Sequence, residues 1–164
     1  MKTHKLTLSA VICAVAAVLM IIATYVKTGT LALYALLSAM IMIVRAETDM
    51  KYAIMSYFVI GLLALILPID RRIMLSFVCV FGIYPILKAE AERHSGVLQW
   101  VIKLVGFNIC FALLYFLIIN LVGKFKFNLA LVIIAANAAF VIYDIILSFV
   151  YTFYVKNIRH LLIK

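Results

Sequence analysis

The sequence is poor in the residues that keep a globular protein in solution. Only 13% of its 164 residues are charged and only six are acidic, whereas soluble domains carry about 25% charged residues. Two prolines and six glycines provide few turns, and no polar linker divides the chain. Because 69% of the residues are hydrophobic, a soluble protein of this length could not bury them. The composition therefore indicates a single transmembrane domain, residues 1–164, in contact with membrane lipid.

Residue patterns that support catalysis or metal binding are also missing. The three cysteines, Cys13, Cys79 and Cys110, lie inside apolar runs and are not spaced like metal ligands, so we expect no disulfide framework and no metal site. The chain has no Gly-x-Ser-x-Gly, no His-Glu-x-x-His and no phosphate-binding loop with its lysine. We therefore expect neither an enzyme nor a cofactor, and any uphill transport would need a partner or an ion gradient.

The net charge of +9 has a simpler explanation than nucleic-acid binding. The basic residues occupy short connections between apolar runs, and they do not alternate with aromatic residues that could stack on bases. Basic residues in such connections set membrane topology and attract anionic headgroups. We therefore expect no nucleic acid among the partners.

Six apolar runs predict an all-α bundle. A membrane-crossing helix needs about 20 apolar residues, whereas a membrane strand needs about 9–11 with alternating polarity. The runs are long and do not alternate, and they predict transmembrane helices over about residues 6–26, 31–45, 52–69, 73–88, 97–122 and 127–155. The first run continues unbroken to Val26, which favours an uncleaved helix over a signal peptide.

Lysine and arginine are unevenly divided between the two sides that six crossings would create. The side with both termini would hold ten of them: Lys2, Lys5, Arg45, Lys51, Lys88, Arg93, Lys103, Lys156, Arg159 and Lys164. The other side would hold five: Lys27, Arg71, Arg72, Lys124 and Lys126. Because short cytoplasmic connections carry the excess of basic residues, we expect a multi-pass protein with both termini in the cytoplasm.

Asp144 is the only acidic residue inside an apolar run. Lys88 has a similar predicted depth at the end of the fourth run, so we expect a buried Lys88–Asp144 ion pair. Charged groups in the membrane are costly and are paired or functional. Two interpretations stay open: a structural role for Asp144, or a role in proton or substrate chemistry. Pro85 predicts a kink just before Lys88.

The polar residues within the fifth and sixth apolar runs are spaced so that they predict a polar surface inside the helix bundle. Asn137 and Asp144 share one face of the sixth run, and Asn108 and Tyr115 share one face of the fifth. The candidate substrate-binding residues are Asn137, Asp144, Asn108, Tyr115, Asn120, Arg71 and Arg72. Hydrogen bonds between helices would explain the same asparagines without a ligand, so both interpretations stay open.

Small residues line one face of the first run. Ala10, Ala14 and Ala17 are spaced four and three apart, which places them on the same side of a helix. Small side chains let a second helix approach closely. We therefore predict that these three alanines form a docking face, either for another helix of the bundle or for a partner protein.

The chain length, the six predicted helices and the Ala10-x-x-x-Ala14 pattern resemble the substrate-binding S components of energy-coupling factor (ECF) transporters. The segment from Leu6 to Ala17 is similar to their first helix. The resemblance implies uptake of a vitamin or related micronutrient across a prokaryotic plasma membrane, with a small-molecule ligand bound on the outer side. It also implies a transmembrane coupling subunit that docks at Ala10 and Ala14, and ATPase subunits. The alternative is a non-transporting membrane scaffold or assembly protein.

Overall fold

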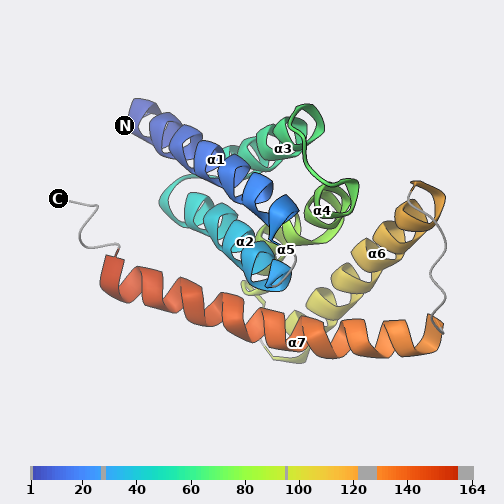
Figure 1. Ribbon diagram of the computed structural model, residues 1–164. Coiled ribbons are helices and arrows are strands. Elements are labelled where there is room, and N and C mark those ends of the chain that lie inside the picture. The colour runs from blue at the N-terminus through green and yellow to red at the C-terminus, as the bar shows by residue number, and fades with distance from the viewer. Residues whose placement is uncertain (1, 27–28, 95, 122–128, 159–164) are drawn as a thin grey trace. The chain divides into compact units, whose positions relative to one another are not determined.

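The computed structural model describes residues 2–26, 29–94, 96–121 and 129–158, and the regular structure in them is helical. Figure 1 shows the helices in chain order. They are α1 (Lys2–Tyr25), α2 (Thr30–Glu47), α3 (Met50–Ile66), α4 (Arg71–Ser76), η1 (Phe77–Phe81), α5 (Tyr84–Ala91), α6 (Val97–Leu121), α7 (Leu129–Phe153) and η2 (Tyr154–Ile158). The segment Arg71–Ala91, formed by α4, η1 and α5, is called the rod below. The all-α prediction is confirmed for the described residues.

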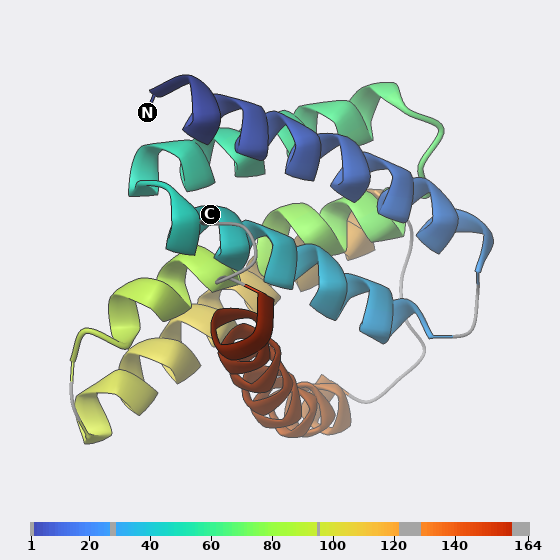
Figure 2. The same ribbon diagram turned by 90° about the vertical axis from the view of Figure 1, so that its left-hand side faces the viewer.

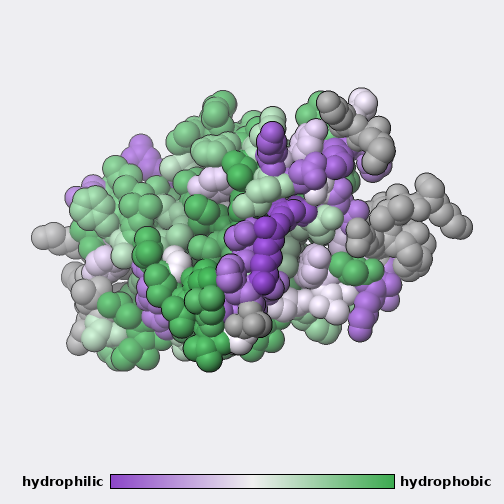
Figure 3. Space-filling model, turned by 180° about the vertical axis from the view of Figure 1, so that it is seen from behind, coloured by the Kyte–Doolittle hydropathy of each residue, from purple (hydrophilic) through white to green (hydrophobic). Residues whose placement is uncertain are grey.

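Among the residues that the structure describes, four helices are long and apolar enough to cross a membrane: Thr3–Tyr25, Arg71–Ala91, Val97–Leu121 and Ala130–Asn157. The helix Met50–Ile66 is apolar but shorter. Hydrophobic side chains also cover much of the molecular face in Figure 3, as lipid contact requires. The chain therefore has the helices of a membrane protein, while the prediction of six crossings stays a prediction.

Several predicted helix limits differ from the structure by a few residues. The third helix ends at Ile66 rather than at residue 69, because Leu67 is extended, with ψ of 154°, as expected before Pro68. The rod begins at Arg71 and extends to Ala91, beyond the predicted end at residue 88. The extension follows from the segment after Leu87, which is rich in helix formers. Several predicted positions lie outside the described residues: 122, 127 and 128 in the spans, and Lys27, Lys124, Lys126, Arg159 and Lys164 among the basic residues.

The chain divides into two compact units, Met1–Phe125 and Lys126–Lys164. In the first unit, α1, α2 and α3 pack against one another, α2 packs against α5, and α5 packs against α6; Figure 2 shows α1 running alongside α2. The second unit contains α7 and η2. The single domain predicted from the sequence stays a prediction. The core of the first unit includes Ala16, Met20, Leu37, Ile41, Val44, Ala53, Ile60 and Phe77.

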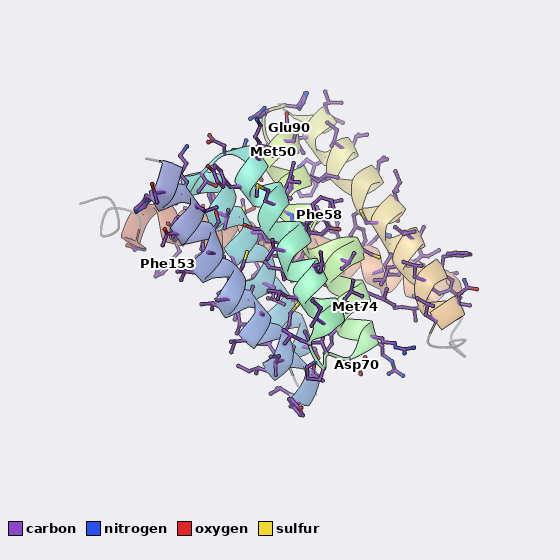
Figure 4. The ribbon with its side chains drawn as sticks, turned by 90° about the horizontal axis from the view of Figure 1, so that it is seen from above. Met50, Phe58, Asp70, Met74, Glu90 and Phe153 are labelled. Carbon is purple, nitrogen blue, oxygen red and sulfur yellow. The ribbon has the colours of Figure 1, made fainter. Side chains whose placement is uncertain are left out.

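Hydrogen bonds define two opposite ends of the first unit. Lys5 Nζ donates to Asp49 Oδ2 at 2.8 Å, which joins the start of α1 to the α2–α3 connection. The backbone N–H of Asp70 donates to Thr24 Oγ1 at 3.3 Å, which joins the end of α1 to the α3–α4 connection. Figure 4 shows Met50 and Glu90 at one end of these helices and Asp70 and Met74 at the other. We call them the Asp49 end and the Asp70 end.

Candidate functional site

The rod is interrupted at its centre by the π-helix η1. The N–H of Gly82 donates to Phe77 O, five residues earlier, at 2.7 Å, so it does not make the regular bond to Val78 O. Pro85 has no N–H, so Phe81 O cannot receive its regular bond either. Two carbonyls in the middle of the rod, Val78 O and Phe81 O, therefore lose their regular donor four residues later, and lipid offers no replacement for it.

Two hydroxyls from neighbouring helices supply these donors. The hydroxyl of Tyr57, on α3, donates to Val78 O at 2.8 Å. Ser38 Oγ, on α2, lies 2.7 Å from Phe81 O and 2.9 Å from Tyr34 O, and its single proton is shared between them. Ser38 is fully buried. We call these two hydroxyls and the two carbonyls that they cap the polar hub.

The polar hub was not predicted from the sequence. Pro85 predicts a kink, but the hydroxyls that replace the lost backbone bonds were not identified. The available signal was a serine near the centre of α2 and a tyrosine near the centre of α3, both in mostly apolar stretches of these helices. Such residues in a membrane helix usually donate to a neighbouring helix or to their own backbone.

The break is closely packed as well as hydrogen-bonded. A Cβ atom at Gly82 would lie 2.8 Å from Tyr57 Cδ2 and 2.9 Å from Phe77 O. The ring of Tyr34 stacks on Phe81 with centroids 4.4 Å apart. Glycine at position 82 is therefore what lets the Tyr57 ring reach the rod and place its hydroxyl against Val78 O.

A second polar cluster joins α5 to α6 at the Asp49 end. Lys88 Nζ lies 3.2 Å from Glu92 Oε1, and Lys103 Nζ lies 3.1 Å from the same oxygen. The two lysine side chains are 0% and 2% exposed. Lys103 Nζ also lies 5.4 Å from the ring centroid of Trp100, within cation–π range. The carboxylate of Glu92 thus pairs with the ammonium groups of two buried lysines. The predicted Lys88–Asp144 pair would join the two units and stays a prediction.

The predicted ligand-binding asparagines bond to their own helices. The side-chain amides of Asn108, Asn120 and Asn137 donate to the carbonyls four residues earlier, at 2.9, 2.7 and 3.0 Å. On α7, the Ser148 hydroxyl donates in the same way to the backbone oxygen of Asp144 at 2.9 Å. These are the local bonds that polar side chains make within helices, and they do not by themselves indicate a ligand.

The predicted substrate-binding residues are divided between the two units. Arg71, Arg72, Asn108, Tyr115 and Asn120 belong to the first unit, where α4 packs against α6. Arg71 and Arg72 are exposed at the Asp70 end, where Asp70 Oδ1 accepts from the Arg72 N–H at 2.7 Å. Asn137 and Asp144 belong to the second unit. A ligand site formed by all seven residues would need side chains from both units, and it stays a prediction.

The predicted docking face on α1 is partly exposed. Ala10 and Ala14 are exposed, whereas Ala17 is 8% exposed and belongs to the core. Cys13 and Ala16, which lie beside this face on the same helix, are also buried. Two of the three predicted docking residues are thus on the surface of the first unit, and Ala17 packs within it.

Comparison with protein-family models, with curated proteins and with solved structures finds no match to this chain. Within residues 2–26, 29–94, 96–121 and 129–158, no group of three or more His, Cys, Asp or Glu side chains is arranged to hold a metal ion. The features of the described residues that bear on function are the exposed face of α1, the polar hub, the cluster of Lys88, Glu92 and Lys103, and the charge distribution.

Proposed function

We propose that the chain is the membrane-embedded, substrate-binding subunit of an ECF-type uptake transporter for a small solute such as a vitamin or related micronutrient. The observation that carries the proposal is the exposed position of Ala10 and Ala14 on a helix whose other side is packed against α2 and α3. Small side chains on an exposed face fit the close approach of a partner helix. The partner would be a transmembrane coupling subunit that works with ATPase subunits.

The charge distribution of the first unit supports an orientation for this subunit. Lys5, Arg45, Lys51, Arg93 and Lys103 lie towards the Asp49 end, and Arg71 and Arg72 lie at the Asp70 end. By the positive-inside rule, this distribution favours the Asp49 end, and with it the N-terminus, on the cytoplasmic side. The proposal that the C-terminus is also cytoplasmic comes from the six predicted crossings, and the proposal of a prokaryotic cell comes from the ECF resemblance. The Asp70 end faces outward, where two arginines would attract an anionic solute.

The test is native mass spectrometry of the tagged protein extracted gently from its host membrane. The proposal expects coupling and ATPase subunits, or a small molecule of defined mass, to accompany the chain. Ala14→Trp should abolish subunit association while the bundle stays folded. Val15→Trp is the matched control, because Val15 is also exposed on α1 but points about 100° away. Equal association of both variants with the subunits would contradict the docking role.

One observation favours the alternative, a membrane scaffold or assembly protein without a ligand. The amides of Asn108 and Asn120 donate to their own helix, and the hydroxyls of the polar hub donate to backbone carbonyls. These polar side chains thus have partners within the protein, as expected of a bundle that holds no substrate. A chain that appears alone and empty in native mass spectrometry, or with unrelated membrane proteins, would support the scaffold.

A further inference from the structure

The polar hub replaces backbone hydrogen bonds with side-chain bonds at one point of the rod. Val78 O and Phe81 O, which lack their regular donors, accept from Tyr57 and Ser38. These donors belong to α3 and α2, so the rod is held at this point by its neighbours. Helices kink and flex where the backbone ladder is interrupted by proline or a π-bulge, and π-bulges occur often at functional positions.

We propose that residues 77–85 form a hinge in the rod, and that the hydroxyls of Ser38 and Tyr57 hold it closed. Opening would break the two side-chain bonds and leave the regular backbone bonds of α4 and α5 intact. The inference goes beyond the proposed function and does not depend on it, since a scaffold with the same hub would contain the same hinge.

The hinge lies between two charged regions. The α4 half of the rod carries Arg71 and Arg72 at the Asp70 end. The α5 half carries Lys88, whose ammonium group is bound to Glu92 near the Asp49 end. Movement at the hub would therefore shift α5 and its charged cluster relative to α4. The hinge would therefore couple the position of Arg71 and Arg72 at the Asp70 end to the position of the Lys88 cluster at the Asp49 end.

The direct test is hydrogen–deuterium exchange, measured by mass spectrometry on the intact chain in micelles. Tyr57→Phe removes one oxygen atom and leaves the ring over Gly82, and Ser38→Ala removes the second hydroxyl. Each variant should exchange about 2- to 12-fold faster at residues 82–87, the ratio expected for one lost hydrogen bond. Exchange in α1 and in the first half of α3 should stay at the wild-type rate.

Two variants serve as controls for this experiment. Ser9 is also buried, but its hydroxyl donates to Lys5 O on its own helix at 2.8 Å, so Ser9→Ala should leave residues 82–87 unchanged. Tyr25 is 73% exposed, so Tyr25→Phe should do the same. The hinge is refuted if Tyr57→Phe and Ser38→Ala match wild type at residues 82–87, or if they accelerate exchange equally throughout the first unit.

A second measurement does not depend on exchange rates. Pro85→Ala supplies the N–H that Phe81 O lacks, so it should take over the role of the Ser38 hydroxyl. In thermal unfolding, Ser38→Ala should therefore lower Tm less in the Pro85→Ala background than in wild type. Equal shifts of Tm in both backgrounds would show that Ser38 does not compensate for the missing N–H donor. The proposal that the Ser38 hydroxyl holds the hinge closed would then be wrong.

Discussion

Gly106 allows the close packing of α5 against α6. A Cβ atom at position 106 would lie 2.5 Å from Leu87 Cδ1, 3.2 Å from its Cδ2 and 3.4 Å from its Cγ. Attractive contacts between carbon atoms occur at about 3.5–4.0 Å, so the Leu87 side chain would have to move. The perturbation that tests this contact is Gly106→Ala, which adds a single methyl group.

Two opposing effects determine how Gly106→Ala changes the free energy of unfolding. Replacing glycine by alanine in a helix stabilises it by about 1 kcal/mol, whereas extra carbon in a packed interface costs about 1–3 kcal/mol. Gly61→Ala is the matched control, because its Cβ would meet Val78 Cγ2 at an ordinary 3.6 Å. The helix-propensity gain cancels between the two variants. Gly106→Ala should therefore be less stable than Gly61→Ala by about 1–3 kcal/mol.

The assay is reversible unfolding of both variants in mixed micelles, followed by circular dichroism. Leu87→Ala removes the side-chain atoms that would collide with the new methyl group. Leu87→Ala should therefore lower the free energy of unfolding less in the Gly106→Ala background than in wild type, by about 0.5–3 kcal/mol. The reasoning is wrong if Gly106→Ala is at least as stable as Gly61→Ala, or if the cost of Leu87→Ala is the same in both backgrounds.

Three other predictions use the same unfolding assay. Gly82→Ala should be more destabilising than the Gly61 control, because one of its close contacts, at 2.9 Å, is a backbone oxygen; equal stability would contradict the packing argument. Glu92→Gln should cost about 1.5–3 kcal/mol, since Glu92 binds two buried lysines, while Glu90→Gln, whose partner is exposed, should cost much less. The hydrogen bond from Lys5 lowers the pKa of Asp49 below 3.8, so its stabilising effect is present above that pH and is lost on further acidification. The difference in Tm between wild type and Asp49→Asn should therefore shrink below about pH 4, and a constant difference would refute the pairing.

The order and type of the helices could be predicted from the sequence because lipid imposes a simple rule. A chain in a bilayer must satisfy its backbone inside each segment, so an apolar run of sufficient length becomes a helix. The limits follow from local chemistry, as Leu67 before Pro68 shows. The prediction for that helix was too long because hydrophobicity continues to Ile69, beyond the point where the proline ends the helix.

The polar hub could not be predicted from the sequence because its partners are distant along the chain. Pro85 reveals a missing donor, but the hydroxyl that replaces it is at position 38. Which helices meet at the break depends on the packing of the whole first unit. The same reason separates Ala14 from Ala17: both lie on one face by spacing, but the position of the neighbouring helices decides which one is exposed.

The predicted ligand residues show a different limit. Spacing places Asn108 and Tyr115 on one side of α6, but it does not determine the side-chain torsions. The amide of Asn108 turns back to Leu104 O, a bond that is available at any position along a helix. A polar stripe in a membrane helix is therefore compatible with both a binding surface and local satisfaction of the backbone.

The polar hub also has a consequence for biogenesis. Ser38 precedes Phe81 by 43 residues, so at about 5–20 residues per second the ribosome adds Ser38 roughly 2–9 seconds before its acceptor. Tyr57 is also synthesised before Val78. Both donors are therefore made before the interrupted segment that needs them enters the bilayer. A chain that lacks α2 and α3 should insert residues 71–91 poorly, because two carbonyls would reach hydrocarbon without their donors.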